Sequence, residues 1–258
     1  MQRDIYQPHY FRICQMRNSE EYFLEKYSRQ IMMEQVGIEG QKKIYDSSIC
    51  IVGCGGLGTS AAQYLSMSGI GRLVLIDHDS IMLSNLNRQT LFTEKDIGLS
   101  KCKVLSEKIK NINKSININY YPKKINEKNV DLYLENCPII LDCTDNFESR
   151  LIINKFCHNK KKILVSAALQ NFHVQAFIFS SWSNKKNPCY KCIFPSLTTD
   201  ENLSCDDMGI IASVAGLGGI IQANLALNYI LKLNSNFKEL ILLDSIDLDL
   251  RKIKIEKN

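Results

Sequence analysis

Three glycines and an aspartate have the spacing of a nucleotide site. Gly53, Gly55 and Gly58 form the pattern G-x-G-x-x-G directly after an apolar run and directly before a helical pattern. Glycine permits a tight turn there and lets an anion reach the free amides at a helix N-terminus. Asp77 ends the next apolar run, where a carboxylate accepts hydrogen bonds from ribose hydroxyls. The glycines alone would also suit a purely structural turn, but in this context they predict nucleotide binding, and by themselves a dinucleotide.

Fixed positive charges follow Asp77. Arg88 lies in the run Ser84-Asn85-Leu86-Asn87-Arg88-Gln89, and Lys101 comes shortly after it. Cations at the carboxyl end of the second strand suit a triphosphate, because the departure of pyrophosphate requires neutralisation of charge on the β and γ groups. Each cation taken alone would more simply form a surface salt bridge. Together they move the expectation from a dinucleotide to ATP.

Two carboxylates end a third apolar run. Asp142 and Asp145 follow residues 139–141, and carboxylates at that position suit Mg²⁺, which usually reaches a protein through one or two carboxylates. The alternative is that Asp145 or Asn146 caps the helix that begins near Phe147. Both interpretations place these side chains at the end of a strand.

The elements that must position these residues alternate between strand and helix. Alternation of this kind predicts a Rossmann-like α/β fold: a doubly wound, mainly parallel sheet with helices on both faces, followed by antiparallel C-terminal strands. Ligands in such a fold bind beyond the carboxyl ends of the strands. The expected strands are 49–52, 73–76, 116–121, 139–141, 163–166, 174–179, 240–243 and 246–255, and the expected helices lie within 28–45 and at 57–69, 101–112, 127–135, 147–159 and 209–233.

The composition limits the class of protein. The chain has 258 residues, of which 45% are hydrophobic, which is enough for one large domain with a sizeable core. Its 32 basic and 27 acidic residues are scattered, so no nucleic-acid partner is expected. The ten cysteines lie mainly in apolar strands and helices rather than in a secreted framework, which favours a reducing cytoplasm.

Two segments need separate interpretations. Residues 209–233 are long and apolar, but polar side chains such as Gln222 and Asn224 interrupt them, so we expect a buried helix and no membrane span. Residues 1–22 show no clear period, and we treat them as an N-terminal extension of unknown role. A single domain is then expected over residues 23–258.

Taken together, these segments resemble the MoeB/ThiF family of adenylyltransferases, which are relatives of the ubiquitin-activating enzymes. The resemblance covers about residues 24 to 256 and implies an enzyme that uses ATP and Mg²⁺ to adenylate the C-terminal glycine of a ubiquitin-like sulfur carrier. The segments that carry it are 27–31 (YSRQI), 53–58 (GCGGLG), 83–89 (LSNLNRQ), 98–101 (GLSK), 142–146 (DCTDN) and 189–192 (CYKC).

The resemblance also implies roles for individual residues. Arg88 and Lys101 would neutralise the phosphates, and Asp145 would hold Mg²⁺. Arg29 matches a residue that reaches into the ATP site of a partner subunit, in the manner of an arginine finger, which implies a homodimer. The full set expected to contact ATP or its metal is Arg29, Gly53, Gly55, Gly56, Gly58, Asp77, Ser84, Asn85, Arg88, Gln89, Lys101, Asp145 and Asn146.

Three cysteines match positions of the family, but the family's second cysteine pair is missing. Cys189 and Cys192 form C-x-x-C, the spacing of half a tetrahedral zinc site, but no second pair follows near Ile255, where the family carries one. A four-cysteine zinc site is therefore not expected in its usual form, and a remnant, a site completed otherwise or free thiols remain alternatives. Cys205 matches a cysteine that can link covalently to the sulfur carrier.

Other functions remain open. The glycine pattern and Asp77 would also fit an oxidoreductase with a nicotinamide cofactor, and the missing cysteine pair would fit a non-catalytic protein that only binds the carrier. For the carrier itself, the thiamine pathway is favoured by the segments 27–31, 91–93 and 192–195, with the molybdopterin pathway as the alternative.

Overall fold

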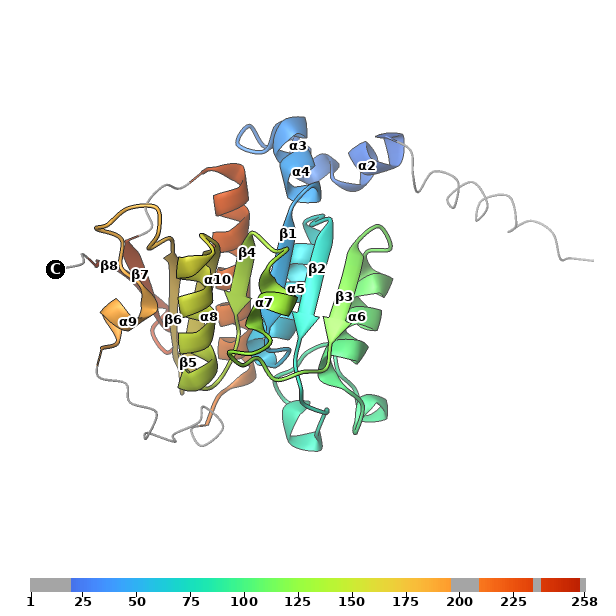
Figure 1. Cartoon of the computed structure of the whole chain (residues 1–258). Coiled ribbons are helices and arrows are strands. Elements are labelled where there is room, and N and C mark those ends of the chain that lie inside the picture. Colours follow the sequence, from blue (N-terminus) through green and yellow to red (C-terminus); the bar gives the residue numbers. More distant parts are fainter. Residues whose placement is uncertain (1–19, 196–208, 234–237, 256–258) are drawn as a thin grey trace, which may run out of the picture.

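A computed structural model describes residues 20–195, 209–233 and 238–255. Its centre is one eight-stranded sheet with the order β3-β2-β1-β4-β5-β6-β7-β8 (Figure 1). Neighbouring strands from β3 to β5 are parallel, and those from β5 to β8 are antiparallel. The strands are β1 (Ser48–Val52), β2 (Arg72–Ile76), β3 (Asn117–Tyr121), β4 (Ile139–Asp142), β5 (Ile163–Gln170), β6 (His173–Phe179), β7 (Glu239–Asp244) and β8 (Asp249–Lys254).

Helices cover both faces of the sheet, as the sequence predicts. Along β1, Ile49 and Ile51 pack into one core cluster while Cys50 and Val52 pack into the other, because successive side chains of a strand point to opposite faces. The helices of the first face are α5 (Gly56–Met67), α6 (Lys101–Ile112) and α10 (Ala212–Leu231), and those of the second are α7 (Val130–Leu134), α8 (Phe147–Asn159) and α9 (Tyr190–Ile193).

The topology creates a crevice between β1 and β4. These strands are neighbours, but the helices that follow them, α5 and α8, pack on opposite faces of the sheet. Chains that leave adjacent strand ends in opposite directions open a space beyond those ends, and ligands of doubly wound folds bind there.

Three helices lie at the other end of the sheet. They are α2 (Glu20–Lys26), α3 (Ser28–Ile31) and α4 (Gly37–Tyr45), near the amino ends of the parallel strands (Figure 1). Tyr27, between α2 and α3, is buried, and its hydroxyl accepts a hydrogen bond from Nδ2 of Asn113 at 3.1 Å. The helix α2 begins at Glu20, inside the segment that the sequence assigns to an extension.

The long apolar segment forms a core helix. Among the described residues, α10 alone is long and apolar enough to cross a membrane, a test that buried helices of ordinary domains also pass. It packs on α5, β5 and β6, and the side chain of Gln222 at its centre is fully buried. The expected burial holds for one face of α10, since 39% of its most apolar window is buried.

The start of the last strand was predicted wrongly. The alternation of Ile246, Leu248 and Leu250 with aspartates suggested a strand from 246, but β8 begins at Asp249. Residues 245–248 form a turn in which the Ile246 amide donates to Oδ1 of Asp244, and Leu248 has a φ of 55°. The apolar side chains of Ile246 and Leu248 are 66% and 73% exposed, so their spacing reflects no buried face.

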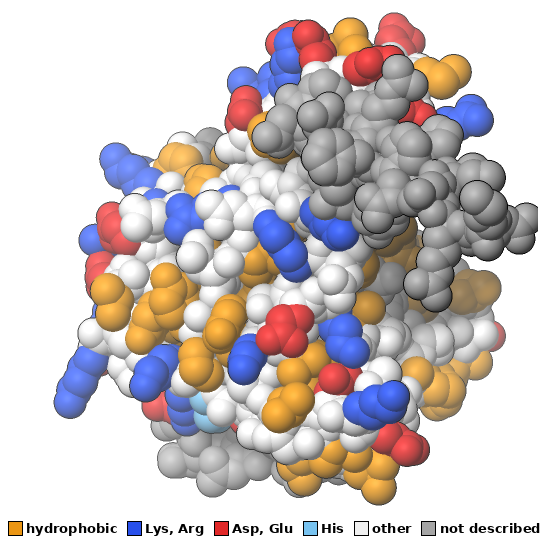
Figure 2. Space-filling view, turned by 90° about the vertical axis from the view of Figure 1, so that its right-hand side faces the viewer, with side chains coloured by type: hydrophobic (Ala, Val, Ile, Leu, Met, Phe, Trp, Pro, Cys, Tyr) orange, Lys and Arg blue, Asp and Glu red, His pale blue; other side chains and the backbone are white. Residues whose placement is uncertain are grey.

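Charges are interspersed on the face beside β3 and α6. Figure 2 shows Lys and Arg side chains among acidic and apolar ones there, with no extended region of one sign. The scattered basic residues of the sequence are thus scattered on this face as well.

Candidate functional site

A cleft lies where the crevice was expected. Its walls come from the segments after β1, β2, β3 and β4 and from the start of α10, and its empty space is about 950 Å³, part of it open to solvent. Most residues predicted to contact a nucleotide line it: Gly53, Gly55, Gly56, Asp77, Asn85, Arg88, Gln89, Lys101, Asp145 and Asn146.

The glycines of the turn have different physical roles. Gly53 has a φ of +94°, and a Cβ there would lie 2.5 Å from the carbonyl oxygen of Cys143. Gly58 does not line the cleft; a side chain there would collide with the carbonyl of Gly53. Gly55 and Gly56 do line it, at the N-terminus of α5, where the first amides of a helix have no intrahelical partner. The turn therefore presents backbone donors to an anion.

Asp77 is fixed before any ligand arrives. Its Oδ2 accepts the Cys54 amide at 2.6 Å and its Oδ1 accepts the Asp79 amide at 2.8 Å. Burial raises the pKa of Asp77 above the ordinary value, while the charge of Lys101 and the two amides oppose that shift. Each carboxylate oxygen has a further lone pair, so the group can still accept hydrogen bonds from a ligand.

Lys101 is held by a carboxylate that sequence reasoning missed. Its Nζ lies 2.8 Å from Oδ2 of Asp79, which is two residues after Asp77 in the same loop. Partial burial acts to raise the pKa of Asp79, but the hydrogen bond and charge of Lys101 outweigh burial and lower it. Asp77, His78 and Asp79 form the one group of three possible metal ligands within the described ranges, but the ion pair with Lys101 already balances Asp79.

Arg88 and its neighbours follow a short helix, η1 (Leu83–Asn85). The Arg88 NH1 donates to the carbonyl of Ser84 at 2.9 Å, whereas the Ser84 side chain does not line the cleft. Oδ1 of Asn85 accepts the Met82 amide at 3.1 Å. Oε1 of Gln89 is buried and has no hydrogen-bond partner among residues 20–195, 209–233 and 238–255.

Asp145 and Asn146 divide the two predicted roles, metal binding and capping of α8. Oδ1 of Asn146 accepts the Ser149 amide at 2.9 Å, so Asn146 is the residue that caps α8. Its Nδ2 donates to Oδ1 of Asp145 at 3.1 Å. Asp145 is exposed and lines the cleft, which leaves carboxylate oxygens for a cation.

Asp142 does not join Asp145, and the prediction of two carboxylates for Mg²⁺ was wrong in this respect. Asp142 is fully buried: Oδ1 accepts the amide and hydroxyl of Thr144, and Oδ2 accepts the Ser166 hydroxyl at 2.7 Å. NH1 of Arg150 lies 3.7 Å from Oδ2. The Asp142 carboxylate therefore makes its hydrogen bonds inside the protein and is not available to a metal ion in the cleft.

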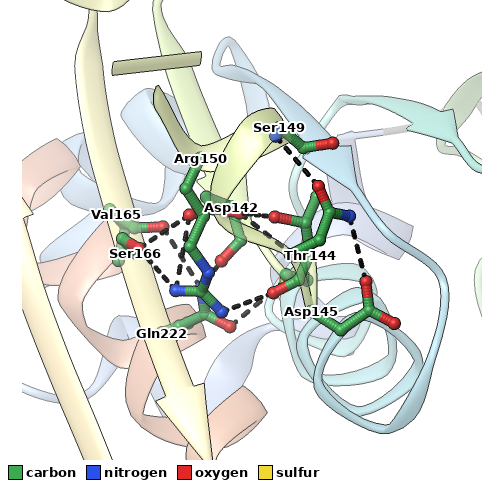
Figure 3. Close-up of polar contacts among 10 residues, drawn as sticks. Asp142, Thr144, Asp145, Ser149, Arg150, Val165, Ser166 and Gln222 are labelled. Carbon is green, nitrogen blue, oxygen red and sulfur yellow. Dashed lines mark hydrogen bonds and ion pairs between the residues drawn. The ribbon is translucent and has the colours of Figure 1, made fainter. Parts of the chain in front are cut away.

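This buried group supports the loop that carries Asp145. Arg150 donates to the carbonyl of Thr144, and Nε2 of Gln222 donates to the carbonyls of Asp142 and Val165 (Figure 3). Sequence reasoning missed Arg150, Ser166 and Gln222 as a set. Their only signal was polarity inside apolar segments, because the contacts join β4, β5, α8 and α10 across long stretches of chain.

The remaining predicted residues lie elsewhere. Arg29 is exposed on α3, at the end of the sheet opposite the cleft, and does not line the cleft of its own chain. Cys189 and Cys192 lie at α9, with their Sγ atoms 3.0 Å apart. Cys205 falls outside the described residues.

Fold and cleft define a Rossmann-like α/β protein whose cleft carries the cations Arg88 and Lys101, and comparison with known proteins identifies its family. The ThiF family model matches residues 27–258, and the chain belongs to the ThiF family. It is 35% identical to the molybdopterin-synthase adenylyltransferase of Haemophilus influenzae over 90% of this chain and 95% of that protein. The family is thus established, and that relative is named an adenylyltransferase.

Other relatives are longer. Adenylyltransferase and sulfurtransferase MOCS3 of Xenopus laevis is 34% identical over 89% of this chain, which spans 51% of that protein. The chain thus spans about half the length of the MOCS3 relatives that it matches. The name of the Haemophilus influenzae relative favours the molybdopterin alternative over the thiamine pathway that the sequence segments suggested.

Solved structures agree on the fold. Escherichia coli MccB with ATP superposes with a TM-score of 0.75 over 90% of this chain and 72% of that chain, at 22% identity. A selenomethionine structure of PaaA superposes with the same TM-score over 93% of this chain and 75% of that chain, at 21% identity. At such low identity the likeness concerns the fold alone.

Proposed function

We propose that this chain uses ATP and Mg²⁺ to adenylate the C-terminal carboxylate of a ubiquitin-like sulfur carrier, with release of pyrophosphate. One observation carries the proposal: backbone donors at Gly55 and Gly56, the cations Arg88 and Lys101, and the exposed carboxylate of Asp145 line a single cleft. An oxidoreductase would also need the glycine turn and Asp77, but its reaction has no departing pyrophosphate for two cations to stabilise.

Each group has a defined part in that chemistry. Asp77 would bind the ribose, and the amides of the turn would bind phosphate oxygens. An oxygen of the carrier carboxylate attacks the α-phosphorus, the bond to the β-phosphate oxygen breaks, and pyrophosphate leaves. Lys101 and Arg88 stabilise the charge that develops on the departing group, so the protein contributes position and charge rather than a covalent intermediate.

Asp145 fits a divalent cation. It offers exposed carboxylate oxygens at the cleft, and the neighbouring Asn146 amide holds one of them in place. Oxygen ligands of this kind suit Mg²⁺, which when bound would neutralise phosphate charge. Asp142 would contribute only by holding the loop.

We propose the small subunit of a molybdopterin synthase as the carrier. Support comes from the relative named molybdopterin-synthase adenylyltransferase, which this chain covers over 95% of its length. A thiamine-pathway carrier is the second candidate, favoured by segments 27–31, 91–93 and 192–195.

Arg29 fits a role in a second subunit. It lies at the opposite end of the sheet from its own cleft, and the exposed Met32 and Met33 follow it. Exposed apolar side chains next to a cation suit a subunit contact. The proposal is a homodimer in which Arg29 of one protomer completes the cleft of the other. Separately, we propose that Cys205 links covalently to the carrier.

The direct test is to mix the protein and MgATP with each purified carrier and look for the carrier adenylate by mass spectrometry. The molybdopterin carrier should gain one adenylyl group, and a matched carrier without its terminal glycine should gain none. Adenylation of the thiamine carrier alone would reverse the choice of carrier. No adenylate and no pyrophosphate exchange with either carrier, together with NADH binding seen by fluorescence, would support the oxidoreductase instead.

A further inference from the structure

Two thiols lie close together at the surface, away from the glycine turn. Sγ of Cys189 is 3.0 Å from Sγ of Cys192, and Cys192 is exposed. Figure 1 places α9, which carries Cys192, beside β6, β7 and β8. The other cysteines within the described ranges are all buried: Cys50, Cys54, Cys102, Cys137, Cys143 and Cys157. Within those ranges, only this pair is open to a reagent in solution.

The backbone that carries the pair is anchored. Between the two cysteines, Tyr190 is buried, with its ring 6.0 Å from that of Phe179 in β6 and 4.9 Å from that of Phe194. The Tyr190 amide donates to Oδ1 of Asn154 in α8 at 3.0 Å. The amide of Cys192 also donates to the carbonyl of Cys189 at 2.9 Å. The thiols are therefore held facing each other by the backbone around them.

The described surroundings supply no metal site for the pair. Across the described ranges, the one group of three close metal-binding side chains is Asp77, His78 and Asp79, none of which is a neighbour of α9. A tetrahedral zinc ion with Zn–S bonds of about 2.3 Å would also hold two sulfurs roughly 3.8 Å apart. The observed 3.0 Å is closer than that arrangement requires.

We propose that Cys189 and Cys192 form a redox dithiol that is oxidised reversibly to an intramolecular disulfide by a low-molecular-weight disulfide such as oxidised glutathione. The inference does not depend on the adenylation chemistry or on the carrier. It assigns a second, separate reactivity to the chain.

The exposures of the two thiols set the order of the steps. Cys192, the exposed thiol, loses its proton and attacks one sulfur of glutathione disulfide, which forms a mixed disulfide and releases one glutathione thiolate. Cys189, 3.0 Å away, loses its proton and attacks Sγ of Cys192, which releases the second glutathione thiolate. Two electrons pass from the pair to the reagent, and the two protons convert the released thiolates to thiols.

The test uses the full-length protein in glutathione buffers that range from reduced to oxidised. Remaining thiols are alkylated, and digested peptides are analysed by mass spectrometry. We expect the peptide with residues 189–192 to lose two hydrogens in oxidised buffer and regain them with dithiothreitol, while the six buried cysteines react only after unfolding. Cys205→Ser should behave in the same way.

Single variants distinguish this mechanism from random oxidation. Cys189→Ser removes the resolving thiol, so Cys192 should retain one glutathione as a stable mixed disulfide. Cys192→Ser should acquire glutathione much more slowly, because Cys189 is less exposed. Metal analysis of the purified protein is done in parallel.

Three results would overturn the proposal. The first is about one zinc per chain, retained through dialysis against a chelator and protecting both thiols from alkylation. The second is a disulfide between either thiol and Cys205 instead of the internal one. The third is a pair that stays reduced in fully oxidised buffer.

Discussion

The ammonium of Lys101 lies 2.8 Å from the carboxylate of Asp79, so the cation assigned to the phosphates is already paired in the free protein. The Lys101 side chain is 9% exposed and that of Asp79 is 46% exposed. A nearly buried ammonium without a partner would be costly, and Asp79 removes that cost at the rim of the cleft. An arriving phosphate then meets a cation whose position is already set.

Removal of either cation should abolish adenylation while the fold persists. Arg88→Ala and Lys101→Ala should each slow pyrophosphate exchange by about 100-fold or more, because each removes charge that stabilises the departing pyrophosphate. Arg88→Lys is the matched control: it keeps the charge without the guanidinium fork and should recover part of the rate. Near-normal exchange in both alanine variants, with circular dichroism unchanged, would disprove the assignment.

Asp79 should make stability depend on acid. Its pKa is lowered in the folded chain, so the stability that it contributes is present above the unfolded value, near pH 4, and is lost as the pH falls through the lower folded value. The group is partly exposed, so the contribution should stay below about 1 kcal/mol. The free energies of unfolding of Asp79→Asn and the parent chain, measured in urea, should differ at pH 7 and converge as the pH falls below the ordinary aspartate value. A difference in the free energy of unfolding that grows as the pH falls would contradict the prediction.

Asp77 should make the affinity for ATP depend on pH, and here the relevant pKa is raised rather than lowered. Burial raises its pKa, so as the pH falls the carboxylate becomes protonated earlier than an ordinary aspartate and loses capacity to accept ribose hydroxyls. The dissociation constant for ATP, measured by calorimetry from pH 8 downwards, should therefore begin to rise above pH 4. The 2′,3′-dideoxy nucleotide is the control, since its affinity should vary less over the same interval.

Asp145 and Asn146 should separate catalysis from stability. Asp145→Asn should suppress Mg²⁺-dependent exchange with little change in the free energy of unfolding, because the side chain is exposed and does not cap α8. Asn146→Ala should lower that free energy by about 1 kcal/mol through loss of the cap, and Asn146→Ser should restore most of it. If Asp145→Asn proved as destabilising as Asn146→Ala, the division of roles would be wrong.

The parts of this site that could be predicted are those encoded over short distances. Gly53, Gly55 and Asp77 follow from local spacing, and a cap at Asp145 or Asn146 followed from their place before an apolar helix. The pairing of Asp79 with Lys101, which are 22 residues apart, depends on how the loop after β2 meets α6. Likewise, Gln222 reaches Asp142 only because α10 packs under the sheet, 80 residues further along the chain. Such contacts are set by tertiary packing, which no local pattern specifies.

The first residue of β8 was missed for a different reason. The alternation of Ile246 and Leu248 with aspartates is local, but the hydrogen bond from Ile246 to Asp244 and the left-handed φ of Leu248 make it a turn. A period of two indicates a strand only where one set of side chains becomes buried.

The buried pair of Asp142 and Arg150 should couple strongly. Asp142→Ala leaves the guanidinium buried without its carboxylate and should cost about 3–5 kcal/mol in the free energy of unfolding. The double variant Asp142→Ala with Arg150→Met removes both charges and should be more stable than Asp142→Ala alone. A double-mutant cycle by urea unfolding measures the coupling, and additive losses would mean that the two groups act independently.

Three glycines allow backbone strain and collision to be measured separately. Gly53 has a φ of +94° and a Cβ position 2.5 Å from the Cys143 carbonyl, whereas Gly98 has a φ of +84° and no atom within 4 Å of its Cβ position. Gly98→Ala should therefore cost only the strain of a left-handed residue, about 1–2 kcal/mol. Gly53→Ala should cost distinctly more, because β1 and β4 must also move apart, and it should abolish ATP binding.

Gly55 is the control position. The nearest atom to its Cβ position is 3.6 Å away and its φ is −82°, so Gly55→Ala should leave the free energy of unfolding nearly unchanged. Urea unfolding should show the largest loss of stability for Gly53→Ala, a smaller loss for Gly98→Ala and the smallest for Gly55→Ala. Equal losses for Gly53→Ala and Gly98→Ala would show that contact with Cys143 is not what requires a glycine at the start of the turn.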